Sequence, residues 1–301
     1  MPAASVEYFA EGGVAFAPTA VNGKKYWSSR TDFPGTLVWQ PIFAFAGAPG
    51  ELGYTTGVWE LKKENEPSLG FGHYVTIWIK QRDAKWKIAL DVGTENPQPR
   101  EPPPNLEILA PEITEQPRDD AHRNLRKAEG KFTDAARNDI GKAIVDSATD
   151  DIRVYRDKSF PAGGLVAVKL MLGSEHEQVT FESAGSKISS SGDLYYSYGN
   201  YSEKRGNITE RGIYVMIWRT NMNGDWKIAL PAKELIFFRG AQAASLQRPS
   251  RSDLPASWRQ HDIESDNVPG LVRPDGVAFC RRVVTPVSGH FCLFPESLAL
   301  L

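Results

Sequence analysis

Aromatic side chains with polar tips are the residues of this sequence whose types and spacing best suit a binding site. They fall in apolar runs typical of strands, in which alternate residues face opposite sides of a sheet. A tyrosine hydroxyl or an indole N–H can orient a small ligand against an apolar wall. The candidate ligand-binding residues are Tyr54, Trp59, Tyr74, Trp78, Tyr198, Tyr214 and Trp218. The competing interpretation is that these rings form the core beneath covering helices.

Ionisable residues offer few candidates for chemistry. His73 opens a predicted strand and is a candidate proton acceptor, although a lone histidine is more often structural. Asp150-Asp151 suits a turn. The five histidines and the two cysteines, Cys280 and Cys292, never cluster at metal-ligand spacing, so we predict no metal site. The glycine-rich segments lack the lysine and the strand–helix context of a phosphate-binding loop. With no such loop and no metal site, we predict no cofactor.

The elements that would position the aromatic residues occur twice. GHYVTIWIKQRDAKWKIAL spans 72–90, and GIYVMIWRTNMNGDWKIAL spans 212–230, about 140 residues later. Each copy reads as two apolar runs around a short polar turn, and Asn223-Gly224 is a strong hairpin signal. We therefore predict one β-hairpin in each of two domains.

Length and composition are those of an ordinary globular protein. The 301 residues suggest two domains, with 41% hydrophobic and 24% charged residues. The formal net charge of −2 gives no general attraction to nucleic acid, and no apolar run reaches the roughly 18 residues of a membrane span. No signal peptide is visible, so the compartment is unknown, and it would be periplasmic or extracellular if a signal peptide lies upstream of Met1.

The chain divides into four predicted segments. Residues 1–95 form a first domain, 96–118 a proline-rich linker, 119–239 a second domain and 240–301 a tail. Residues 119–147 carry apolar residues at helical spacing. The counterpart of that helix would precede Met1, so the first domain is expected to lack its N-terminal helix.

The tail differs from the rest in composition. Residues 240–301 contain both cysteines but no lysine, and they show no clear period of 2 or 3.6. We expect an irregular segment in which Cys280 and Cys292 are incidental thiols, with a single disulfide between them as the alternative.

Each repeat resembles the NTF2-like superfamily, in particular its SnoaL-like and DUF4440 branches. In the second copy the matching residues are Asp150-Asp151, Ser191-Gly192-Asp193-Leu194-Tyr195-Tyr196, Gly199, Gly212, Tyr214, Trp218, Gly224 and Trp226. In the first copy they are Gly50-Glu51-Leu52-Gly53-Tyr54-Thr55-Thr56-Gly57, Gly72, Tyr74, Trp78 and Trp86. The resemblance implies two α+β cones, each a curved antiparallel sheet with helices on its concave face.

The resemblance also implies where an enzyme of this superfamily would keep its catalytic groups. Ketosteroid-isomerase-like members use an Asp or His base and a tyrosine or protonated acid that stabilises an enolate. The position of that acid falls near Thr76 or Met216, neither of which can serve. Asp157 lies near the position of the base but one residue out of register, and such a slip turns a side chain to the other face. Asp157 and His73 are thus the candidate bases.

Three functions follow as hypotheses. The first is a non-catalytic tandem NTF2-like protein whose cone binds a small apolar or aromatic molecule. The second is an isomerase, cyclase or hydratase that uses Asp157 or His73. The third is an association module in which the two copies pack sheet to sheet as a pseudo-dimer, or in which whole chains associate. Neither nucleic acid nor a membrane is an expected partner.

Overall fold

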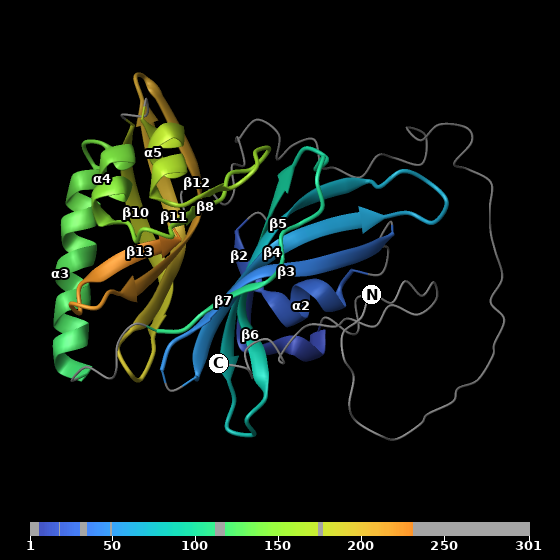
Figure 1. Ribbon diagram of the computed structural model, residues 1–301, viewed down its shortest axis with the longest axis horizontal. Coiled ribbons are helices and arrows are strands. Elements are labelled where there is room, and N and C mark those ends of the chain that lie inside the picture. Colours follow the sequence, from blue (N-terminus) through green and yellow to red (C-terminus); the bar gives the residue numbers. More distant parts are fainter. Residues whose placement is uncertain are drawn as a thin grey trace. The chain divides into compact units, whose positions relative to one another are not determined.

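The computed structural model describes residues 6–17, 19–30, 35–48, 50–111, 118–173 and 177–230. All of them belong to one compact unit of the chain. They form a mixed α+β structure with a seven-stranded and a four-stranded sheet (Figure 1).

The first sheet has the strand order β2-β1-β6-β5-β4-β3-β7. Its central strands β3 to β6 pair antiparallel, whereas β1 runs parallel to β6 and β7 parallel to β3. Helix α2 (Gly23–Ser28) follows β2, and the Asn22 side chain caps it by accepting a bond from the Lys25 N–H. The strands are β1 (Phe9–Phe16), β2 (Ala20–Asn22), β3 (Thr36–Ala46), β4 (Leu52–Lys62), β5 (Gly70–Lys80), β6 (Trp86–Asn96) and β7 (Glu107–Leu109).

The second sheet is antiparallel, in the order β10-β11-β12-β13. Helices α3 (Arg118–Ala136) and α4 (Ile140–Ser147) lie along it, with α5 (Leu165–Leu172) beside them (Figure 1). Apolar residues at helical spacing explain α3, which buries Ala121, Leu125 and Phe132. The strands are β10 (Gln178–Ile188), β11 (Leu194–Arg205), β12 (Ile208–Thr220) and β13 (Trp226–Leu230), and β8 (Arg153–Val154) pairs separately with β9 (Ala162–Gly163).

The two predicted hairpins are confirmed. β5 pairs with β6 and β12 with β13, and in both hairpins the register shifts at the same place, between Ile77 and Trp78 and between Ile217 and Trp218. The turns also match, because the Ala84 N–H donates to the Gln81 carbonyl as the Gly224 N–H does to Asn221. The repeated sequence therefore folds the same way twice, bulge included.

The two turns differ in one residue that should affect stability. Ala84 has φ +63° and Gly224 has φ +79°, a region that costs an L-residue about 1 kcal/mol. We expect Ala84→Gly to raise the free energy of unfolding by up to about 1 kcal/mol and Gly224→Ala to lower it by a similar amount. Urea melts of both variants test this, and equal signs for the two would contradict it.

Two segments bear on the predicted domain boundaries. The proline-rich range 96–118 contributes β7, whose residues Glu107–Leu109 pair with Phe43–Phe45 of β3, so part of this range belongs to the first sheet. The tail from 240 to 301, with Cys280 and Cys292, lies outside the described residues.

Candidate functional site

One side of the first sheet gathers polar and aromatic side chains around an exposed glycine. Alternation along β5 puts Tyr74 and Thr76 on one side, and their β6 partners, Gly93 and Asp91, share it. Trp59 of β4 joins them, because it pairs with Gly72 on the same side of β5. We call the surface formed by Trp59, Tyr74, Thr76, Asp91 and Gly93 the Gly93 face.

The Trp59 indole turns its Nε1 edge toward two neighbouring strands. Its indole Nε1 donates to the carbonyl oxygens of His73 and Thr94, at 3.1 Å each. A Cβ atom at Gly72 would approach the indole to 2.3 Å, so only glycine leaves room for the ring there. The indole therefore reaches from β4 over β5 to β6 with a fixed orientation.

Gly93 is the open position of this face. It is exposed although it lies within a long strand, and a Cβ atom built on it would stand 3.5 Å from Trp59 Nε1 and 3.7 Å from the His73 carbonyl oxygen. Both are ordinary van der Waals distances. An exposed glycine in a strand interior suits the close approach of a ligand to the backbone.

Asp91 is the acidic group beside this position. Its Oδ1 accepts a hydrogen bond of 2.5 Å from the Thr76 hydroxyl, and no cation forms an ion pair with it within the described part of the chain. Burial raises the pKa of Asp91 to about 6, and the Thr76 bond only partly opposes this. The side chain is half-buried, so solvent still reaches it. Asp91 can therefore exchange a proton near neutral pH.

Tyr74 supplies a neutral hydroxyl. Burial, followed by the negative charge of Asp91, raises the pKa of Tyr74 well above its ordinary value, so the phenol stays protonated. Its ring is half-buried and lies 6.3 Å from the ring of Trp39 at an angle of 47°. The Gly93 face thus combines a protonated phenol, an indole and a carboxyl group that titrates near pH 6.

Most of the other predicted ligand-binding residues are core. Tyr54, Trp78, Tyr214 and Trp218 are all buried. Trp78 Nε1 donates to Thr55 Oγ1 at 2.9 Å. Tyr198 is half-buried with its ring 6.2 Å from Phe16.

The second sheet fills the corresponding side with a helix. Phe132 of α3 packs edge-on against Trp218 at 5.7 Å and lies 5.7 Å from Phe181, which contacts Tyr214 at 5.0 Å. These four rings interlock, which leaves the Gly93 face as the partly open counterpart.

The two predicted bases occupy structural positions. His73 points to the side of β5 opposite Asp91, and its Nδ1 lies 2.6 Å from Asn96 Oδ1. Burial lowers its pKa, so it is neutral at pH 7. Asp157 accepts a 2.9 Å bond from the Glu95 N–H, and the Lys158 N–H donates to the Glu95 carbonyl at 2.7 Å. The last two bonds pair the backbone N–H and carbonyl groups of Glu95 at the end of β6. Neither His73 nor Asp157 lies on the Gly93 face.

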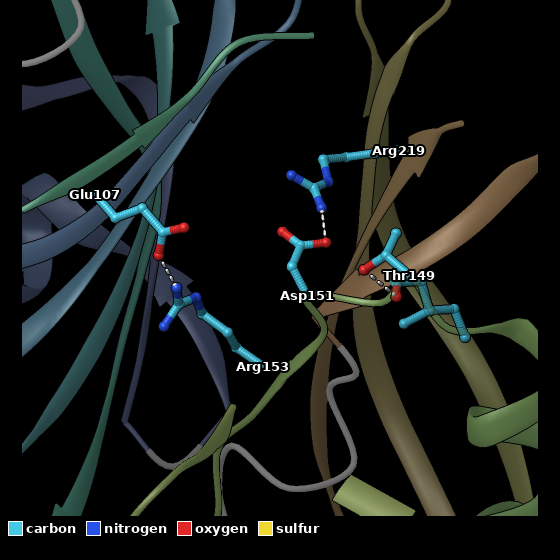
Figure 2. Close-up of polar contacts among 6 residues, drawn as sticks. Glu107, Thr149, Asp151, Arg153 and Arg219 are labelled. Atoms are coloured by element: carbon cyan, nitrogen blue, oxygen red, sulfur yellow. Dashed lines mark hydrogen bonds and ion pairs between the residues drawn. The ribbon is translucent and has the colours of Figure 1, made fainter. Parts of the chain in front are cut away.

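Of the acidic pair Asp150-Asp151, Asp151 is bound within the fold and Asp150 is exposed. Asp151 forms an ion pair with Arg219, which is only 7% exposed, and Arg219 lies over the ring of Phe45 (Figure 2). A second pair joins Arg153 to Glu107 at 2.5 Å (Figure 2). We assign both to stability.

Among the described residues, no group of three or more His, Cys, Asp or Glu side chains could hold a metal ion. No helix in the same part of the chain is long and apolar enough to cross a membrane.

Comparison with known proteins gives a structural likeness only. No family model matches the chain, and no curated protein matches it. The solved structures that resemble it include NTF2-like and ketosteroid isomerase-like proteins.

Three of these structures give the extent of the likeness. An NTF2-like protein of unknown function from Pseudomonas putida is 17% identical over 38% of this chain and 84% of its own, with a TM-score of 0.31. A ketosteroid isomerase-like protein from Erwinia carotovora is 20% identical over 36% and 91%, with a TM-score of 0.29. An NTF2-like protein with a cystatin-like fold from Novosphingobium aromaticivorans is 13% identical over 42% and 90%, with a TM-score of 0.31. Activity has to be argued from the chain's own residues.

Sequence reasoning missed Asp91, Thr76 as its partner, and Gly93. One signal was available: WKIAL is followed by Asp91 in the first copy and by Pro231 in the second. A carboxylate that only one copy carries, on the second strand of the repeated hairpin, marks where the copies diverge.

Proposed function

We propose that this chain is a tandem NTF2-like protein, of SnoaL-like type, that binds a small, flat, largely apolar molecule on the Gly93 face and leaves it unchanged. The observation that carries the proposal is the exposed Gly93 beside a fixed indole, with Tyr74 and Asp91 on the same side. A flat ligand can lie on the glycine backbone, contact Trp59, and place one polar atom against the phenol or the carboxyl group.

Among the described residues, the first copy alone has this arrangement. In the second, Phe132 of α3 covers the equivalent side, so the two copies would have separate roles, one for binding and one for support. The repeated hairpins and their matching bulges support a tandem origin.

A valine at Gly93 tests the binding site. Its Cβ fits at ordinary contact distance and β-branched residues suit strands, so Gly93→Val should fold while filling the open position. We expect this variant to bind any small aromatic ligand found by tryptophan fluorescence with an affinity at least tenfold lower.

Gly130→Val is the matched control. Gly130 is exposed on α3, and a Cβ there has no atom within 4 Å. It should bind like the unmodified protein. If both variants bind as well as the unmodified protein, the site is elsewhere. If no compound in a broad aromatic library binds, the proposal is wrong.

A second candidate function is acid–base catalysis with Asp91 as the proton acceptor. The pKa of about 6 favours it, because a base works best when its pKa is near the operating pH. Tyr74 would donate a hydrogen bond to the oxygen of a carbonyl substrate. Solvent deuterium exchange at carbon next to a carbonyl, abolished by Asp91→Asn, would replace the binding proposal with this one.

A third proposal concerns association. Residues of both sheets share one hydrophobic cluster, including Phe43, Phe45 and Tyr54 of the first with Tyr196 and Ile217 of the second. The Ala48 N–H also donates to Asp193 Oδ2 at 2.8 Å. We propose that the two copies associate through these residues as a pseudo-dimer, and a scattering profile of two separate lobes would contradict it.

A further inference from the structure

We infer that the ligand of the Gly93 face is a small organic monocation, an amine or quaternary ammonium attached to a flat apolar group. The inference rests on the proposed binding function and names its ligand class. It follows from what surrounds Asp91 and from the nature of the neighbouring rings.

Asp91 carries a negative charge that no described residue neutralises. The carboxylate has one hydroxyl donor, Thr76, which is itself 2% exposed, and no counter-cation among the residues that the structure describes. Lys80, the lysine on this side of β5, lies instead over the Trp86 ring, 5.7 Å from its centroid. A half-buried carboxylate without a cation attracts one from solution.

The rings beside the carboxylate suit a cation as well. Trp59, Tyr74 and Trp39 are all half-buried, so each ring keeps exposed area. The negative faces of indole and phenol rings attract ammonium groups, tryptophan most strongly. A cation over Gly93 would therefore meet aromatic surface and carboxylate together.

Anionic and neutral ligands suit the negative charge of Asp91 less well than a cation does. A carboxylate or phosphate ligand would face Asp91 with a like charge. A neutral apolar ligand would leave the carboxylate desolvated without compensation. The cation is the ligand class that improves the electrostatics of the site.

A pair of isosteres provides the test. 3-(Trimethylammonio)phenol and 3-tert-butylphenol have nearly the same shape and differ in charge. At pH 7.5 we expect the cation to bind the full chain at least tenfold more tightly, measured by calorimetry. In Asp91→Asn, which keeps the shape and the acceptor for Thr76, the two affinities should fall within about twofold of each other.

Each outcome decides a separate point. If the neutral compound binds as tightly as the cation and Gly93→Val blocks it, the cation inference is wrong and the binding site stands. A cation preference that survives Asp91→Asn also overturns the inference, since another group would then recognise the charge. If neither compound binds, with folding of each variant verified by thermal melting, the cation inference fails, whereas the proposed function fails only if the aromatic library yields no binder either.

Discussion

Replacing Asp91 with asparagine is expected to stabilise the protein at pH 8 by about 3 kcal/mol and to change it little at pH 4. The pKa of Asp91 is about 6 in the fold against 3.8 for an ordinary aspartate. Below pH 3.8 the carboxyl group is protonated in both the folded and the unfolded chain and costs no stability. As the pH rises from 3.8 through 6 the unfolded chain ionises more readily than the folded one, so the free energy of unfolding falls. Asparagine removes the charge and with it that loss.

The measurement is thermal unfolding of both proteins across this pH range. A gain of about 3 kcal/mol corresponds to a rise of roughly 6–10 °C in Tm. The difference between the two proteins should vanish below pH 4. A constant difference at all pH values would show that ionisation of Asp91 does not destabilise the fold.

Thr76→Val is the companion variant. It removes the hydroxyl that donates to Asp91 while keeping the shape of a residue that is 2% exposed. It should destabilise the protein more at pH 8 than at pH 4, because the bond favours the ionised carboxylate. The opposite pH trends of the two variants would tie both effects to the same carboxyl group.

The Asp151 to Arg219 ion pair gives the second large effect. Arg219 is 7% exposed, and Asp151→Ala would remove the carboxylate that it binds. Removing one partner of a buried pair costs about 3–5 kcal/mol, and the 35% exposure of the Asp151 side chain places the expected loss near about 3 kcal/mol. Denaturant unfolding measures it.

Glu107→Ala is the matched control for that experiment. The Glu107 side chain is 51% exposed in its pair with Arg153, so its removal should cost less than about 1 kcal/mol. The double variant Asp151→Leu with Arg219→Met should recover much of the lost stability, because apolar residues of similar volume can replace a buried pair. Equal losses for Asp151→Ala and Glu107→Ala would contradict the difference in burial.

The repeated hairpins were predictable because their signal is local. Alternating β-branched and aromatic residues fix the strands, and a short polar turn between two such runs fixes their pairing. The helical pattern before the second copy likewise predicts α3, since its apolar residues recur at helical spacing. Strand β7 was not predicted, because three residues within a proline-rich stretch carry no period of their own.

The site could be predicted only in part. Trp59 and Tyr74 were identified from residue type, but so were Trp78 and Trp218, and sequence cannot tell which rings a helix covers. Asp91 was missed because its importance depends on pairing with Thr76 across the hairpin and on having no cation near it among the described residues. His73 and Asp157 were chosen for chemical type, yet one points to the other side of the sheet and the other bonds to the Glu95 N–H at the edge of β6.

Tryptophan indole N–H resonances provide the most direct test of the Gly93 face. The chain has eight tryptophans, and ¹⁵N-indole labelling should give one signal for each. On titration with 3-(trimethylammonio)phenol, we expect saturable shifts of the Trp59 and Trp39 signals, assigned by Trp→Phe variants, while Trp218 and Trp226 stay in place. Shifts confined to Trp218 and Trp226, or none at all, would contradict the claim that this face of the first sheet is the binding site.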